Sequence, residues 1–138
     1  MTPFRRKLLM QKHGSNETLV FEQARIAMTN VHGTAGTFGN KFTFVAGTTY
    51  RYVFDFTLSE LQYSTTTGRI RAQDGVFTFL SIDSSMLNQT VHVDSGTDYV
   101  CTNGRERAVF IARSDTTTEG VRDYWSGIVT NLKIYEVH

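Results

Sequence analysis

The clearest hydrophobic pattern in the chain lies between Tyr50 and Leu58. Every second residue there is large and apolar, and the residues between them are polar except for Val53; the apolar positions are Tyr50, Tyr52, Phe54, Phe56 and Leu58. Successive side chains of a β-strand point to opposite faces, so this pattern predicts a strand with one buried face. Because the chain has no long helical pattern, we expect a second sheet to cover that face.

Shorter strand patterns follow along the chain, and turn-forming residues separate them. They cover residues 18–22 and 24–31 (two short strands or one bent strand), 68–73, 76–82, 89–93, 97–102, 105–113 and 124–137. Asp74–Gly75 and Asn103–Gly104 each predict a tight hairpin, because a type I′ turn needs positive φ at both central residues. In the last segment, we expect Ile128, Leu132 and Ile134 to share one face.

Eight to ten strands at this spacing are typical of an antiparallel two-sheet β-sandwich, so the predicted fold class is all-β. We expect seven residues in its core, namely Tyr52, Phe54, Phe56, Leu80, Phe110, Leu132 and Ile134. The only cysteine, Cys101, cannot form an internal disulfide, and its apolar neighbours predict a small buried side chain.

A glycine-rich segment precedes the central strand. Residues 33–41 contain three glycines and end in Lys41, as phosphate-binding loops do. Such a loop needs Ser or Thr after the lysine and a helix to follow. Here Phe42 follows and a strand pattern comes next, so we interpret the segment as a connection whose glycines can adopt positive φ.

The length of 138 residues, with 40% hydrophobic and 12% aromatic side chains, predicts one domain with one core. We place that domain at residues 18–138, preceded by an arm at residues 1–17. The arm carries a group of basic residues before the first acidic one: Arg5, Arg6, Lys7 and Lys12. Two interpretations stay open, a solvated chain end or an arm that lies on a neighbouring subunit or on nucleic acid.

Charge and hydropathy exclude several classes of partner. The formal net charge is only +1, from 14 basic and 13 acidic residues, which gives no electrostatic reason to expect a specific nucleic-acid partner. No apolar run approaches the roughly 20 residues of a membrane span. The first residues also lack the apolar centre of a signal peptide. We therefore expect neither a membrane partner nor secretion.

The sequence contains no recognisable catalytic motif. Its four histidines lack metal-binding spacing, and no Gly-x-Ser-x-Gly elbow occurs. Asp55 lies among aromatic residues, which could raise the pKa of a catalytic carboxyl group. Alternation instead places Asp55 on the polar face with Arg51, and we interpret His92 as a surface residue. We predict a protein that is not an enzyme and has no metal or cofactor.

Aromatic side chains are the remaining candidates for ligand binding, because sugar rings stack on exposed aromatic faces. Tyr124 and Trp125 begin the last strand pattern, and Tyr63 lies in a polar loop. These three residues form the candidate carbohydrate site. The alternative is that the single tryptophan packs in the core or at an edge.

Three segments together resemble a known type of domain: FTFVAGTTYRYVFDF at 42–56, SGTDYVCT at 95–102 and YWSGIVTNLKIYEV at 124–137. They are similar to jelly-roll domains of the carbohydrate-binding-module type, which recur in virion proteins of tailed bacteriophages, including capsid cement or decoration proteins. The resemblance covers roughly residues 18–138. One departure is Asp98–Tyr99, where many sugar-binding members carry tryptophan.

This resemblance implies a non-enzymatic virion protein that is assembled in the host cytoplasm, most specifically a cement protein. Such a protein would form homo-oligomers in the assembly and bind capsid or other virion proteins. Its contacts would come from loops, strand edges and the arm residues Phe4, Arg5, Arg6, Lys7 and Lys12. The alternative implied function is a carbohydrate-binding module that uses Tyr63, Tyr124 and Trp125.

Overall fold

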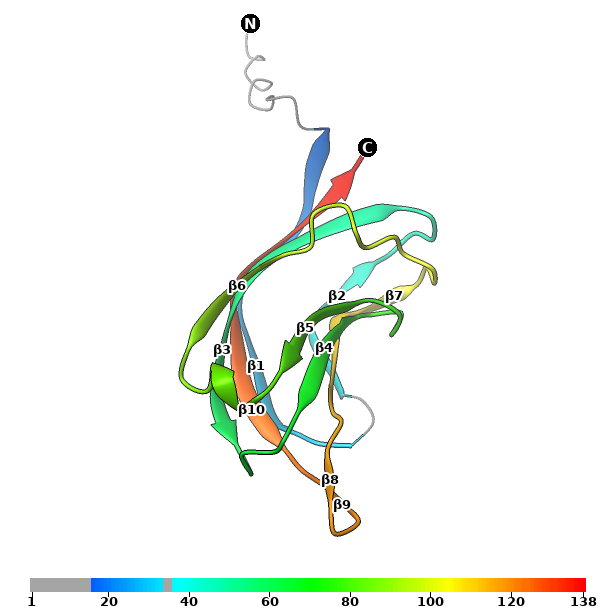
Figure 1. Ribbon diagram of the computed structural model, residues 1–138. Helices are drawn as coiled ribbons and strands as arrows, with labels where there is room; N and C mark the ends of the chain where they lie inside the picture. The colour runs from blue at the N-terminus through cyan, green and yellow to red at the C-terminus, as the bar shows by residue number, and fades with distance from the viewer. Residues whose placement is uncertain (1–15, 34–35) are drawn as a thin grey trace, which may run out of the picture.

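The computed structural model describes residues 16–33 and 36–138, and β-strands make up nearly all of its regular structure (Figure 1). A single 3₁₀ turn occurs in these residues, at Ser84–Met86. The strands, in chain order, are β1 Glu17–Val31, β2 Gly36–Thr43, β3 Thr49–Leu61, β4 Gly68–Ala72, β5 Thr78–Ile82, β6 Thr90–Asp94, β7 Glu106–Ser114, β8 Thr117–Thr118, β9 Val121–Arg122 and β10 Trp125–Val137.

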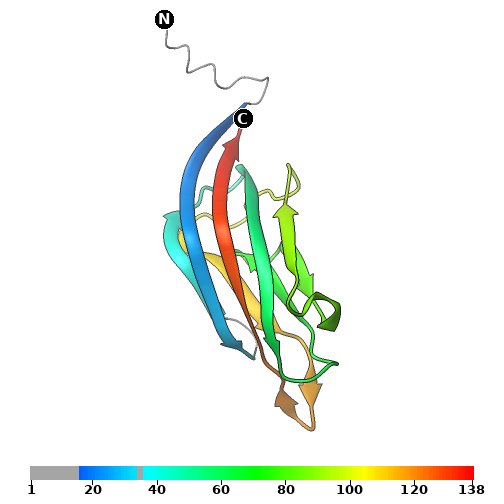
Figure 2. The same cartoon turned by 90° about the vertical axis from the view of Figure 1, so that its left-hand side faces the viewer.

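The strands form two four-stranded antiparallel sheets and one small hairpin. The first sheet has the order β1-β10-β3-β6, the second has the order β2-β7-β4-β5, and β8 pairs with β9. The two sheets pack against each other, with the β8–β9 hairpin at one end and the described chain ends at the other (Figures 1 and 2). This is the eight-stranded order of a jelly roll. The predicted all-β sandwich is confirmed.

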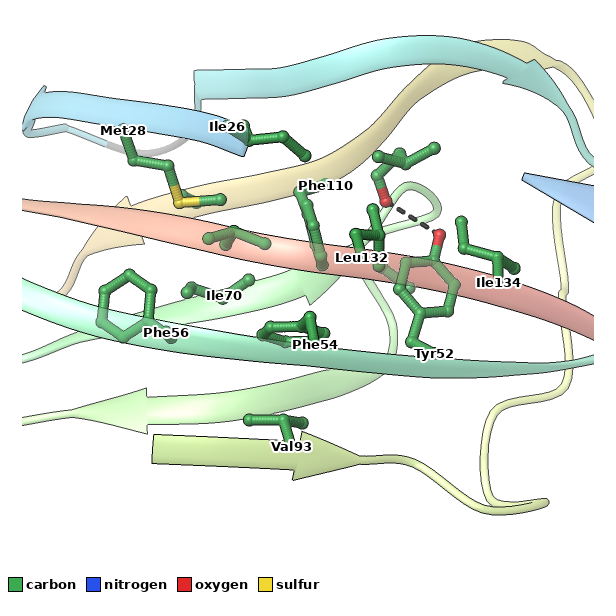
Figure 3. Packing of buried hydrophobic residues seen from close by; sticks show 14 of the residues in the cluster. Ile26, Met28, Tyr52, Phe54, Phe56, Ile70, Val93, Phe110, Leu132 and Ile134 are labelled. Atoms are coloured by element: carbon green, nitrogen blue, oxygen red, sulfur yellow. Dashed lines mark hydrogen bonds between the residues drawn. The ribbon is translucent and has the colours of Figure 1, made fainter. Parts of the chain in front are cut away.

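The core lies between the two sheets, as the alternation in β3 predicts. Tyr50, Tyr52, Phe54, Phe56 and Leu58 are each at most 1% exposed. Figure 3 shows Phe54 and Tyr52 on β3 pointing towards Phe110 on β7. The ring centroids of Phe54 and Phe110 are 5.1 Å apart in an edge-to-face arrangement, and the Tyr52 hydroxyl donates to the Val109 carbonyl at 2.9 Å. Aromatic packing and a satisfied hydroxyl therefore join the layers.

Six of the seven predicted core residues are buried, and Leu80 is the exception. Leu80 is half-buried against the cluster, whereas Ile82, two positions later on β5, is 1% exposed. Cys101 is buried, as its apolar neighbours predicted. The large side chains with almost no exposure are Trp125, Tyr50, Tyr52, Tyr99, Phe44, Phe54, Phe56, Phe110, Met28, Leu58, Ile70 and Ile82.

A β-bulge in β10 changes which residues of that strand face the core. Thr130 pairs with Asp55 and Lys133 pairs with Val53, so two residues of β10 lie opposite one residue of β3. Asn131 has φ of 56°, and the extra residue reverses the alternation. Val129 is buried before the bulge, while Ile128 is only half-buried. The expectation that Ile128 shares the core face with Leu132 and Ile134 was therefore wrong.

Residues 17–31 form one strand with an irregularity between Leu19 and Phe21, rather than two separate strands. The glycine-rich segment was only partly a connection, because Gly36–Thr43 forms β2. Gly39 has φ of 94° at a register shift in this strand. A Cβ at Gly39 would lie 2.7 Å from Val109 Cγ2, so the bulge brings the backbone close to a neighbouring side chain.

The two predicted hairpins have different outcomes. Asp74–Gly75 does join β4 to β5, but only Gly75 has positive φ and the Ala72 amide bonds to the Phe77 carbonyl, so the turn is longer than type I′. Asn103–Gly104 closes no hairpin. The preceding segment bonds instead to the turn before β3, where Cys101 and Thr48 share a backbone bond of 2.9 Å.

Candidate interaction surface

The outer face of the first sheet is polar because it carries the residues of β3 that alternate with the core. Asp55 and His92 are partners in the β3–β6 register, and Asp55 Oδ1 lies 2.8 Å from His92 Nδ1. His92 is exposed and Asp55 is half-exposed. Both residues lie where the strand alternation placed them, on the solvent side of the sheet.

Arg51 joins three strands at the end of the sandwich where β1 begins. Its Nη1 donates to Glu17 Oε1 at 3.0 Å, while Nε and Nη2 donate to the two oxygens of Asp94 at 2.8 and 2.6 Å. The guanidinium carbon also lies 5.6 Å from the centroid of the Tyr135 ring on β10. The bidentate contact with Asp94 and the bond to Glu17 hold the guanidinium group in a fixed position.

The Arg51 contacts change the acid–base behaviour of the neighbouring groups. The hydrogen bond from Arg51 is the largest influence on Asp94, and it lowers the pKa of that carboxyl from its ordinary 3.8 to about 2. The same bond raises the pKa of Arg51. Because Glu17 is the first residue of β1, this network fixes the point at which the arm joins the sandwich.

We expect the replacement Asp94→Asn to lower stability more at pH 6 than at pH 2. The carboxyl has a lower pKa in the folded state, so its stabilising effect is present above the ordinary pKa near 3.8 and is lost as pH falls through about 2. Urea unfolding at pH 6, 4 and 2 measures the difference between variant and native chain. Asp98→Asn is the control, because Asp98 is exposed and has no ion pair with another described residue. If the loss of stability changed with pH equally in Asp94→Asn and Asp98→Asn, the stabilising bond from Arg51 to Asp94 would be contradicted.

A hollow of about 350 Å³ opens on the outer face of the first sheet, over the bulge in β10. Its wall combines apolar groups with hydrogen-bonding groups of both kinds. The bulge leaves one residue of β10 without a partner in its ladder with β3. The lining residues are Glu22, Gln23, Ala24, Val53, Phe54, Asp55, His92, Asn131, Leu132, Lys133 and Tyr135.

β1 forms one of the two edges of the first sheet. Among the described residues, no strand pairs with the outer side of β1. At mid-strand, Gln23 Oε1 accepts a bond of 2.7 Å from the Asn40 amide of β2, which bridges the two sheets. The first half of the strand, Glu17 to Glu22, lies before this bridge, and its Leu19 side chain is 43% exposed. We call these six residues the β1 edge.

The three aromatic residues of the predicted carbohydrate site do not form a platform. Trp125 is fully buried, where its indole packs on Phe56 and donates to the Arg113 carbonyl at 3.0 Å. Tyr124 is half-buried, and only Tyr63 is largely exposed, at 48%. Of the two interpretations of Trp125, packing in the core is the one that holds, because this residue fills the space between the sheets. The arm residues Phe4, Arg5, Arg6, Lys7 and Lys12 lie outside the described residues.

Sequence reasoning missed the contacts of Arg51. The alternation of β3 placed Arg51 on the polar face, but its partners Glu17 and Asp94 are 34 and 43 residues away in the chain. Their proximity depends on the register of β1 and β6, which no local pattern shows. Within residues 16–33 and 36–138, no three or more His, Cys, Asp and Glu side chains group together as metal ligands would. The same residues contain no helix with the length and hydrophobicity of a membrane span.

Comparison with known proteins gives one structural similarity. No family model and no curated protein sequence matches the chain. A chain in the solved "Acidic stable capsid structure of Helicobacter pylori bacteriophage KHP30" is similar, with 15% sequence identity, a TM-score of 0.39, and coverage of 85% of this chain and 94% of that chain. At this degree of similarity, function has to be inferred from the geometry of the chain itself.

Proposed function

We propose that the protein is a non-enzymatic structural protein of a phage virion, most specifically a cement or decoration protein that binds neighbouring capsid subunits. The observation that carries the proposal is the β1 edge, whose outer side pairs with no strand in the described part of the chain and which directly follows the basic arm. The sequence resemblance to jelly-roll domains of tailed-phage virion proteins supplies the setting, a particle assembled in the host cytoplasm.

An unpaired strand edge exposes main-chain donors and acceptors that can pair with another chain. The β1 edge also presents Leu19 to solvent. The irregularity between Leu19 and Phe21 interrupts the flat edge, and such bulges oppose unlimited edge-to-edge addition. A local, specific contact with a neighbouring subunit is the function that this combination favours.

The distribution of charge supports a contact between copies of the protein. Residues 1–15 hold four of the 14 basic residues and none of the 13 acidic residues, so the rest of the chain has ten basic and 13 acidic residues and a net charge of −3. A basic arm and an acidic sandwich attract each other across a subunit boundary. We propose on this basis that the arm docks on an adjacent copy in the assembly.

The non-enzymatic assignment is supported by the surroundings of Asp55. This carboxylate is half-exposed and bonded to the exposed His92. A carboxylic acid that serves as a proton donor at neutral pH is usually held in apolar surroundings that raise its pKa. Asp55 lies on the surface of a sheet instead.

Deletion of residues 1–14 is expected to leave the sandwich folded but to weaken binding to particles that lack the protein. Since ordering the arm consumes part of its binding energy, we expect a loss of about tenfold to a hundredfold in affinity. Cosedimentation with purified particles measures binding, and thermal unfolding checks the fold. A matched variant with Gln at positions 5, 6, 7 and 12 keeps the arm length and isolates the effect of charge. Equal binding by the deleted and native chains would contradict the proposal.

Saccharide binding is the second candidate function, and the hollow over the β10 bulge is the observation that favours it. Its mixture of apolar groups with donors and acceptors suits a sugar ring, which has apolar faces and a rim of hydroxyls. The same experiment separates the two functions. Saccharide binding replaces the cement function if three results occur together. The arm-deleted protein binds particles as well as the full chain, a soluble polysaccharide competes with this particle binding, and Lys133→Ala abolishes the particle binding.

A further inference from the structure

Three arginine side chains gather on the outer face of the second sheet. Arg69 and Arg113 are direct partners in the β4–β7 register, and Arg71 lies two residues further along β4. Between them on β4, Ile70 points inward and is fully buried, so the arginines share the opposite face. Strand spacing and rise place the three Cα atoms within about 10 Å of one another. We call Arg69, Arg71 and Arg113 the arginine cluster.

One carboxylate serves two members of the arginine cluster. Asp115 accepts two bonds from Arg69, at 2.8 Å from Nε and 3.0 Å from Nη2, and lies 2.7 Å from Arg113 Nε. The Arg113 Nε is buried, yet its geometry to Asp115 makes no hydrogen bond. Burial alone would raise the pKa of Asp115, but the bond from Arg69 and the two positive charges lower it. Asp115 is therefore already paired with two members of the arginine cluster.

Arg71 has no carboxylate partner among the described residues, and the undescribed ones contain no acidic side chain. Among residues 16–33 and 36–138, its only polar side-chain contact is a bond of 3.3 Å from Nε to Thr78 Oγ1. Burial and the charges of Arg69 and Arg113 lower the pKa of Arg71. Three guanidinium groups and one carboxylate leave the site with two uncompensated positive charges. Like charges on neighbouring strands destabilise a sheet, so a further anion at Arg71 would relieve repulsion.

We propose that the arginine cluster binds a carboxylate from an acidic segment of a neighbouring protein subunit, with Arg71 as the main contact. Guanidinium groups bind carboxylates with two parallel hydrogen bonds, and such charge-assisted bonds are stronger than those between neutral groups. The inference rests on the proposed structural function for the identity of the neighbour. It adds a second contact surface, on the sheet that does not contain the β1 edge.

Two features favour an acidic protein segment over nucleic acid. The arginine cluster is compact and can neutralise only two or three phosphates, whereas nucleic-acid affinity grows with the number neutralised. Residues 16–138 also carry a net charge of −3, which repels an extended polyanion. Ile111, the register partner of Arg71, is half-buried, and Val76 in the turn between β4 and β5 is 64% exposed. A partner segment with an acidic residue next to an apolar one would match this surface.

A titration followed by NMR tests the arginine cluster with three probes: a hexaglutamate peptide, a hexaglutamine peptide and a six-nucleotide thymidine oligomer. We expect hexaglutamate alone to shift the amide signals of β4 and β7, and Arg71→Gln to weaken its binding at least fivefold. Arg71→Lys should retain part of the affinity. Arg25→Gln is the matched control, since Arg25 is an exposed arginine on the other sheet, and it should leave binding unchanged. Equal losses in Arg71→Gln and Arg25→Gln, or tighter binding of the oligonucleotide, would overturn the proposal.

Particle binding by the same variants separates this inference from the proposed function. If arm deletion weakens particle binding and Arg71→Gln does not, the cement function stands and the subunit contact at the arginine cluster is refuted. If the full chain fails to bind particles but hexaglutamate still binds at Arg71, the cement function is refuted and the carboxylate site stands. Weakened particle binding in Arg71→Gln, with Arg25→Gln unchanged, supports both.

Discussion

Replacing Phe54 with alanine is expected to lower the free energy of unfolding by about 3 to 5 kcal/mol. Phe54 is 1% exposed and packs edge-to-face against Phe79 and Phe110 of the opposite sheet. Truncation removes buried apolar surface and both aromatic contacts, and leaves a cavity that two packed sheets can fill only in part. Urea unfolding followed by tryptophan fluorescence measures the loss, because Trp125 is buried in the same core.

Val53→Ala is the matched control for this prediction. Val53 is the neighbour of Phe54 on β3 but faces outward and is half-buried. Its truncation removes less buried surface, and we expect a loss below about 1 kcal/mol. A loss of that size for Phe54→Ala as well would show that the even-numbered positions of β3 do not form the packed face.

Gly68→Ala is expected to cost about 3 kcal/mol or more, although it adds a single methyl group. A Cβ at Gly68 would collide with the indole nitrogen of Trp125 and lie 2.5 Å from the Arg113 carbonyl oxygen. These two groups form a hydrogen bond of 3.0 Å directly beside Gly68. The methyl group must therefore displace a buried tryptophan and break its bond. Thermal and urea unfolding measure the effect.

Gly47→Ala separates this collision from the general cost of replacing glycine. Gly47 has φ of 86°, and a Cβ there would meet no heavy atom within 4 Å. Only the backbone conformation opposes the change, so we expect a loss of about 1 kcal/mol. Gly68→Ala should exceed that value clearly. Equal losses would mean that the Trp125 side chain can move aside without cost.

The sequence predicts the fold class well where a strand has one buried face and its apolar and polar residues alternate regularly. β3 satisfies this condition, since its period of two continues through five large residues and all of them are buried. Prediction failed where an irregularity reverses the alternation, as at Asn131 in β10. It also failed at Asn103–Gly104, because the chain before this pair finds its backbone partners at the turn around Thr48 instead of in β7.

The surface sites were less predictable than the core because they depend on register between distant strands. Arg69 and Arg113 are 44 positions apart in the sequence, and only the β4–β7 ladder makes them neighbours. Trp125 shows the opposite problem, because a tryptophan at the start of a strand can stack on a ligand or fill a core. Its burial follows from Gly68, which leaves room for the indole between the sheets.

The neighbouring positions of the two described chain ends have a practical consequence for fusion proteins. His138 donates its amide to the Asn16 carbonyl at 2.8 Å, and its ring lies 2.9 Å from the Thr18 hydroxyl, so both ends meet at one tip of the sandwich. A protein fused to the C-terminus would therefore crowd the root of the arm. The β8–β9 turn lies at the opposite tip, and Glu119 and Gly120 there are exposed (Figure 1). A peptide grafted into this turn would be far from the arm and the β1 edge, and would leave both free to engage a particle.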